Sequence, residues 1–257
     1  MLSESNVVSG KRAAHINLTD GKPYYVPVSF TADTASFTFN FPETEDGKRW
    51  HVFTMPFRAD SIFVGETPVS LDDENKHFWI YEFAAQGNNG EVIFEPATML
   101  RRGTPYTIAG DAEMAGRSVV FRSLNASFNK SESDILLVTS PDYKFHGITV
   151  ETKVRDCYVL NAAGTAFDYV TTNTTLTGLS AYFITPLPDE ERLQSIVLPM
   201  IPESPDAINE ELRMKSEEFA TAIYNLAGQR IDNPQSTIRN PRLNRGVYIR
   251  NGRKVLF

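Results

Sequence analysis

The sequence predicts an all-β protein: an antiparallel β-sandwich or open barrel body, followed by a small C-terminal β module. Three observations support this prediction. Short runs rich in aromatic and β-branched residues recur through the first 185 residues. Gly, Pro, Asn and Asp separate these runs, as they do at turns. The chain then ends in Asn251-Gly252 flanked by apolar segments, which is the strongest short-range signal for a β-hairpin.

The predicted strands of the body are short and closely spaced. No window in this region keeps a helical apolar period for three turns, and many short strands between turn signals are typical of a sandwich or barrel. Proline at 23, 27 and 56 places the adjoining strands at edges or bulges. The segments predicted as strands are 24–30, 36–41, 50–57, 77–83, 91–95, 118–121, 135–138, 157–160 and 181–184.

One internal repeat is visible in the body. The segments "TMLRRGTPYTI" (98–108) and "TTLTGLSAYFI" (174–184) share Thr, Leu, Tyr and Ile at an offset of 76 residues. We interpret the match as two similar halves, each closing with an extended strand. Chance convergence of two similar hairpins is the alternative.

Residues 186–220 are predicted to be a Pro-rich and acidic linker. The body is therefore expected to span residues 1–185, and the terminal module residues 221–257. The stretch 206–226, which begins in the linker and runs into the terminal module, has two interpretations, a helix that begins near Asp206 or an extended charged segment. The linker prolines are Pro186, Pro188, Pro199, Pro202 and Pro205.

Charge is unevenly distributed along the chain. The net charge is −7, to which residues 230–257 contribute +6 and the remaining residues −13. An acidic body is repelled by phosphates, so no nucleic-acid partner is expected. The apolar runs are far shorter than the roughly 20 residues of a membrane span, so no membrane span is expected either.

The single cysteine limits the covalent and metal chemistry. Cys157 alone allows neither an intrachain disulfide nor a cysteine-based zinc cluster. The polar N-terminus lacks the basic start and apolar stretch of a secretory signal. Two expectations follow from it: the protein stays inside the cell, or the sequence is a mature fragment with an added start methionine.

The sequence lacks the common catalytic motifs. No nucleophile elbow, P-loop, dinucleotide glycine pattern or HExxH arrangement occurs in the sequence. We interpret Cys157 as a buried strand residue rather than a nucleophile. The scattered histidines are interpreted as packed or surface residues rather than ligands, and they are His15, His51, His77 and His146. We therefore expect no catalytic residue, no cofactor and no metal, and hence a protein that is not an enzyme.

Two groups of side chains have alternative interpretations. Oxygens of Asp72, Asp73, Glu74 and Asn75 suit calcium, but the segment lacks the pattern of an EF-hand, so a solvated loop is preferred. Aromatic residues in predicted strands either fill the core, which we prefer, or form an exposed row that stacks on sugars. These aromatic residues are Tyr24, Tyr25, Trp50, Trp79, Tyr106 and Tyr182.

The C-terminal hairpin has a definite predicted register. A two-residue turn at Asn251-Gly252 places Tyr248 opposite Val255 and Arg250 opposite Arg253. Apolar side chains then occupy both faces, so the hairpin must pair with residues 222–226 and pack on something.

The tail and the body resemble a known group of proteins. The segments "IYNLAGQRI" and "LNRGVYIRNGRKVLF" are similar to the C-terminal module of many secreted or surface proteins of Bacteroidales bacteria, with the pattern "YxLxGxR…GVYIxNGxKV". The body resembles the domain that precedes such tails, in the segments 18–41, 50–57, 103–108, 145–151, 157–167 and 178–184. Some related tails resemble type IX secretion sorting domains, and three roles stay open for this tail: a sorting signal, an attachment point or a small capping domain.

The resemblance implies a function class. Members of this group are mostly large surface proteins described as adhesins, so we expect a non-enzymatic extracellular or cell-surface module, adhesin-like or accessory to a larger protein. The expected partner is an unidentified protein or glycan at the cell surface. The first alternative is a carbohydrate-binding module that uses exposed aromatic residues, and the second is a glycoside-processing enzyme.

Overall fold

The computed structural model describes residues 8–43, 49–73, 75–86, 92–130 and 137–202, together with strands at 223–224, 247–250 and 253–256. The regular secondary structure of these described residues consists of β-strands, apart from one 3₁₀ turn, η1 (Ala112–Met114). The prediction of an all-β fold is therefore confirmed. No helix in the described part of the chain has the length and apolarity to span a membrane. The chain divides into two compact units, Met1–Pro202 and Glu203–Phe257.

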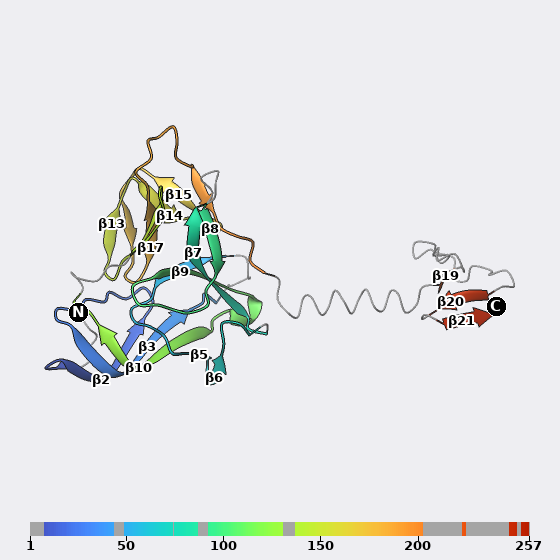
Figure 1. Cartoon of the computed structure of the whole chain (residues 1–257), viewed down its shortest axis with the longest axis horizontal. Helices are drawn as coiled ribbons and strands as arrows, with labels where there is room; N and C mark the ends of the chain where they lie inside the picture. The colour runs from blue at the N-terminus through green and yellow to red at the C-terminus, as the bar shows by residue number, and fades with distance from the viewer. Residues whose placement is uncertain are drawn as a thin grey trace. The chain divides into compact units, whose positions relative to one another are not determined.

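Three larger sheets build the first unit, which we call the body (Figure 1). The first sheet has the order β1 (Val8–Ser9), β2 (Arg12–Thr19), β3 (Phe30–Asn40), β10 (Ser118–Phe128), β5 (Ser61–Val64) and β6 (Thr67–Val69). The central sheet has the order β4 (His51–Thr54), β9 (Pro105–Gly110), β7 (Phe78–Gln86) and β8 (Val92–Pro96). The third sheet has the order β11 (Leu137–Thr139), β12 (Lys144–Gly147), β17 (Ala181–Ile184), β14 (Cys157–Leu160), β15 (Ala166–Val170) and β18 (Ser195–Val197).

The central sheet is buried on both faces. All six residues of β9 are buried, and they alternate between two hydrophobic cores. Tyr106 and Ile108 belong to the first core, which the first sheet completes, whereas Ala109 belongs to the second core, which the third sheet completes. The body is thus two sandwiches that share a middle layer. In Figure 1 the first sheet lies at the bottom of the body and the third at its top, with β9 between them.

Phenylalanine rings dominate both cores. In the first core, Phe53 of the central sheet stacks on Phe121 of the first sheet with ring centroids 5.5 Å apart. In the second core, Phe145 and Phe183 of the third sheet stack at 4.1 Å, and Phe83 of the central sheet contacts Phe183 edge-on at 5.3 Å. Each ring buries a large apolar area, so the ring contacts between sheets stabilise the packing of the layers.

The predicted repeat has a structural counterpart at one point. Gly103 and Leu179, which match at the offset of 76 residues, both have positive φ, 72° and 61°. Each residue precedes an extended strand, β9 and β17 respectively. Each is also bonded to the end of β4: Gly103 N–H donates to Met55 O, and Leu179 O accepts from Thr54 N–H. The two segments therefore reach the same part of the central sheet.

A glycine contact joins the first sheet to the third. Gly21 and Gly178 form an isolated antiparallel bridge beside the pair β13 (Thr152–Val154) and β16 (Thr174–Leu176). A Cβ atom added at Gly178 would lie 2.7 Å from Lys22 O and 2.8 Å from Pro23 Cα. Only a residue without a side chain allows this approach of the two backbones. We call this region, around Gly21 and Gly178, the seam.

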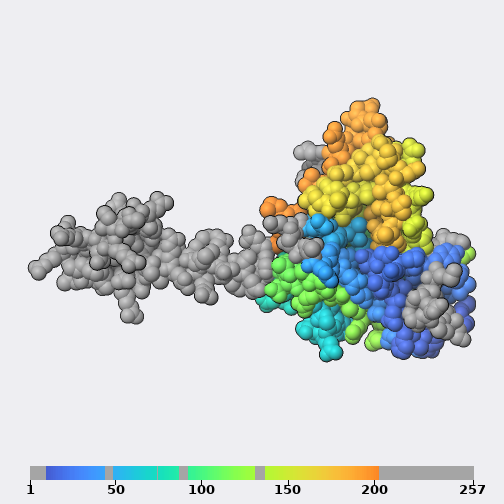
Figure 2. All heavy atoms as spheres, turned by 180° about the vertical axis from the view of Figure 1, so that it is seen from behind, coloured from blue at the N-terminus to red at the C-terminus, as the bar shows by residue number. Residues whose placement is uncertain are grey.

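Away from the seam the two sheets diverge. In Figure 2 the blue N-terminal strands and the yellow-to-orange residues of the third sheet occupy opposite ends of the body.

The body extends past the predicted boundary at residue 185. Strand β18 pairs with β15, with Phe167 opposite Ile196, and Ile196 is buried in the second core. Trp50 Nε1 donates to Pro199 O at 2.9 Å, which fastens the following segment. The body therefore ends at Pro202, and residues 186–202 belong to it rather than to a linker. A three-residue strand among prolines is too short to stand out by its pattern. The rest of the predicted linker, with its possible helix, lies outside the described residues.

The second unit contains the predicted hairpin. Strands β20 (Val247–Arg250) and β21 (Arg253–Leu256) are antiparallel, with Tyr248 opposite Val255 and Arg250 opposite Arg253. Strand β19 (Ile223–Tyr224) pairs with β20, as expected for residues 222–226. The predicted register and the pairing are confirmed. The turn at 251–252 and the burial of the hairpin faces lie outside the described residues.

Candidate functional site

Two histidines serve as structural partners. His77 Nδ1 lies 2.8 Å from Asp111 Oδ2, and Asp111 Oδ1 accepts a hydrogen bond from Glu113 N at the start of η1. This carboxylate therefore caps a turn while it orients the imidazole. His15 hydrogen-bonds through Nδ1 to Thr34 on the outer face of the first sheet at 2.6 Å.

His146 and Cys157 lie on the outer face of the third sheet. His146 stands opposite Tyr182 with ring centroids 5.2 Å apart, and its buried Nδ1 has no hydrogen-bond partner among the described residues. Burial lowers the pKa of His146. Burial, with a smaller contribution from the Asp156 charge, raises the pKa of Cys157 to about 11. The buried thiol is thus protonated at neutral pH, and the interpretation of Cys157 as a buried strand residue is confirmed.

The acidic segment 70–77 forms a hydrogen-bonded loop. Ser70 Oγ donates to Asp72, and this bond holds the pKa of Asp72 below its usual value. Asp73 Oδ1 accepts from Asn75 N at 2.9 Å, as in an Asx-turn. Among the described residues, no three His, Cys, Asp or Glu side chains converge as metal ligands. Glu74 lies outside the described residues.

The aromatic residues considered as a sugar platform mostly fill the cores. Trp50, Tyr24 and Tyr106 are buried, and Tyr106 OH accepts from Arg101 N and donates to Met99 O. Trp79 packs against the second core. Among these six residues Tyr25 alone is classed as exposed, at 38%. The core-filling interpretation therefore describes them better than a row of exposed rings.

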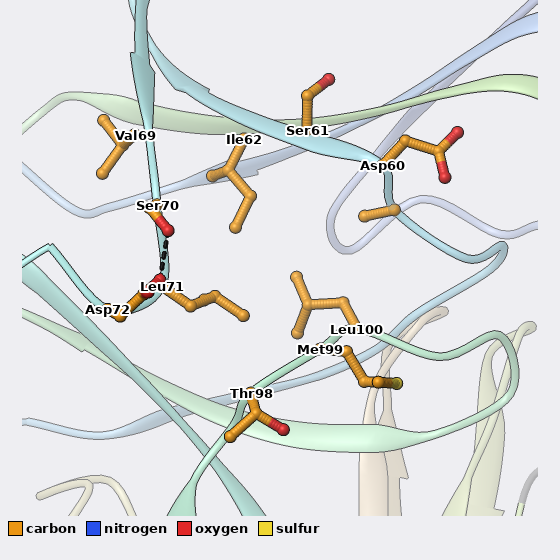
Figure 3. A pocket seen from close by; sticks show the side chains of 11 residues that line it. Asp60, Ser61, Ile62, Val69, Ser70, Leu71, Asp72, Thr98, Met99 and Leu100 are labelled. Carbon is orange, nitrogen blue, oxygen red and sulfur yellow. Dashed lines mark hydrogen bonds between the residues drawn. The ribbon is translucent and has the colours of Figure 1, made fainter.

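The hollow drawn in Figure 3 is small and has an apolar floor. Ile62, Leu71 and Leu100 point into a space of about 200 Å³, while Ser70 and Asp72 hydrogen-bond at its rim. Asp60 lies at the opposite end. Its carboxylate accepts hydrogen bonds from Ser123 Oγ and from Leu124 N. It therefore satisfies a backbone donor of β10 at a position beyond the pairing with β5. The side chains of Asp60, Ser70 and Asp72 are therefore engaged in hydrogen bonds within the fold.

A second hollow lies on the outer face of the first sheet. Its volume is about 270 Å³, and its lining includes Asn17, Ser36, Arg122 and Leu124. Ser36 Oγ donates to Asn17 Oδ1 at 2.7 Å, and the Arg122 guanidinium stacks on Phe63 at 4.2 Å. These contacts hold the polar side chains in place, so the face is preorganised.

At the seam, the pKa of one carboxyl group, that of Asp20, is shifted far from its ordinary value. A cavity of about 370 Å³ there is lined by Asp20, Asn40, His51 and Ser180 together with apolar side chains. Desolvation raises the pKa of Asp20 to about 6, against a hydrogen bond from the Gly21 backbone that lowers it. A perturbed carboxyl group in a cavity is a candidate functional group. Sequence reasoning missed Asp20, because Asp-Gly after an apolar strand is an ordinary turn signal.

Comparison with family models, with curated proteins and with solved structures finds no match for this chain. The functional argument therefore depends on the geometry described above.

Proposed function

We propose that this chain is a non-enzymatic module of a secreted or cell-surface protein, adhesin-like or accessory, which presents a binding face on a rigid β scaffold. The observation that supports this most is the outer face of the first sheet. Cross-strand side-chain bonds organise it into an ordered polar surface: Arg12 with Asp33, His15 with Thr34, and Asn17 with Ser36. A surface that is ordered before contact loses little side-chain entropy on binding.

Leu124 gives this face an apolar anchor. It is 69% exposed and lies beside Arg122 in the second hollow. An apolar side chain surrounded by ordered polar groups matches the general plan of protein interfaces, which have an apolar centre and a polar rim.

A binding experiment tests the proposal. The full chain, coated on beads, should bind one class of cell-surface protein, and Leu124→Asp should weaken that binding about tenfold or more. Val197→Asp is the matched control, because Val197 is 71% exposed on β18 of another sheet. Equal loss in both variants, or hydrolysis of a glycoside by the purified chain, would contradict the proposal.

Carbohydrate binding is a second candidate function. The hollow beside Leu124 offers hydroxyl, amide and guanidinium groups, which can bind sugar hydroxyls. This mode would use polar groups rather than the aromatic row considered from the sequence. Reproducible binding on a glycan array that disappears in Arg122→Ala would favour carbohydrate binding. Binding to protein ligands alone would favour the adhesin-like module.

A further inference from the structure

The seam cavity combines one carboxylate with apolar walls. Asp20 follows the end of β2, and His51 comes from β4; these two are the titratable residues that line the cavity within the described part of the chain. Phe39, Val52 and Leu160 contribute apolar surface from three different strands. At about 370 Å³, the space is large enough for a small organic group.

The charge of Asp20 lacks a compensating cation within the described residues. Two effects act on its carboxyl group, desolvation and the backbone hydrogen bond from Gly21, and neither is a positive charge. At neutral pH most of this carboxylate is ionised, because its pKa is about 6. A desolvated anion of this kind gains most from a ligand that brings a positive charge.

We propose that the seam cavity binds a primary ammonium group on a short aliphatic stem, with Asp20 as the counter-ion. The ammonium donates hydrogen bonds to the carboxylate, and the stem lies against Phe39, Val52 and Leu160. The inference goes beyond the proposed function and does not depend on it. The same chemistry belongs to a free alkylamine and to the side chain of a lysine on a partner protein.

Other ligand classes fit this cavity less well. A neutral alcohol or sugar leaves the buried charge without compensation, and a carboxylate or phosphate adds repulsion. A divalent cation requires more ligands than Asp20 and His51 supply, and no group of three suitable side chains occurs among the described residues. The ammonium group is therefore the ligand whose charge and shape both match.

Titration of the full chain followed by NMR tests the proposal. At pH 7.5, n-butylammonium should bind at least about tenfold more tightly than n-butanol, which has a similar shape without the charge, whereas butyrate should not bind. Asp20→Asn should abolish the preference for the cation. Glu95→Gln is the matched control, since Glu95 is an exposed carboxylate on β8 that does not line the cavity, and it should leave the preference unchanged.

A second measurement keeps the proposal testable if Asp20→Asn does not fold. In the unmodified chain, saturating n-butylammonium should lower the pKa of Asp20 from about 6 towards its ordinary value, as followed by the carboxyl ¹³C shift. Equal binding of n-butylammonium and n-butanol, or an unchanged pKa, would overturn the proposal. A lysine derivative blocked at both backbone ends distinguishes the two sources. Tighter binding of this derivative than of butylammonium indicates a partner's lysine, and the reverse indicates a free amine.

Discussion

The backbone N–H of Thr54 donates a 2.7 Å hydrogen bond to the carbonyl oxygen of Leu179, and Thr54 Oγ1 donates to the next carbonyl, that of Ser180, at the same distance. Thr54 is fully buried at the end of β4. Its backbone N–H and its hydroxyl both find acceptors in the segment that precedes β17. The same threonine packs against Gly147 of β12, where an added Cβ would lie 2.5 Å from Oγ1. Thr54 thus connects the central sheet to β12 and to the segment that precedes β17.

The seam should not tolerate a side chain at position 178. Gly178→Val should lower the free energy of unfolding by about 2 kcal/mol or more, because the added atoms meet the backbone at Lys22 and Pro23. Urea denaturation measures the change. Gly65→Ala is the control: Gly65 has open space around it and positive φ, so the cost there should be about 1 kcal/mol. A Gly178→Val variant as stable as the native chain would contradict the described seam.

Stability should depend on the ionisation of Asp20. The folded-state pKa, about 6, lies above the ordinary value of 3.8, so folding favours the protonated form. The stabilisation is complete below pH 3.8 and is lost as the pH rises through 6. Asp20→Asn should therefore be more stable than the native chain at pH 7.5, by at most about 3 kcal/mol, and its stability should vary less between pH 4 and pH 6.5. Urea denaturation over this pH range measures the free energy of unfolding of both chains. If the stability of the native chain varied with pH no more than that of Asp20→Asn, the prediction would be wrong.

The second core should be sensitive to loss of its central ring. Phe183 is fully buried and contacts Phe83, Phe145 and Phe167, so Phe183→Ala should cost about 3–5 kcal/mol. Calorimetry should show a large fall in Tm. Val197→Ala on the exposed edge of the same sheet should change stability by less than about 0.5 kcal/mol. Similar costs at the two positions would show that Phe183 is not central.

The body should fold without the second unit. A chain that ends at Pro202 keeps every strand of the first three sheets, so its Tm should lie within about 2 °C of that of the full chain. A chain that ends at Leu187 lacks β18 and leaves the second core open where Ile196 is buried, so its Tm should be clearly lower. A large drop already in the first truncation would place part of the second unit in the core of the body.

Local patterns predicted much of the secondary structure. The segments 157–160 and 181–184 coincide with β14 and β17, because both alternate or group apolar residues within turn-bounded runs. The segment 24–30 was wrong as a strand except at its last residue, Phe30. Tyr24 and Val26 are buried in alternation, but proline at 23 and 27 removes backbone donors, so the segment does not join a ladder.

Long-range pairing could not be predicted from the sequence. Strands β2 and β3 are parallel although the segment that connects them contains no helix, and this pairing depends on which edge of the sheet is free. The unusual ionisation of Asp20 likewise arises from residues far apart in the chain, such as Val52 and Leu160, which meet only after folding. Burial of a turn carboxylate has no signature in the local sequence.

The burial of β9 on both faces affects how the body unfolds on heating and how a protease degrades it. If either outer sheet detached, a row of large apolar side chains on the central sheet would face water, either the Tyr106 and Ile108 side or the side that packs on Phe183. Such a partly unfolded species would gain chain entropy, but it would expose a large apolar surface to water, which is unfavourable. The two sandwiches should therefore open together, and limited proteolysis should yield either intact body or small peptides, without a long-lived fragment that corresponds to one half.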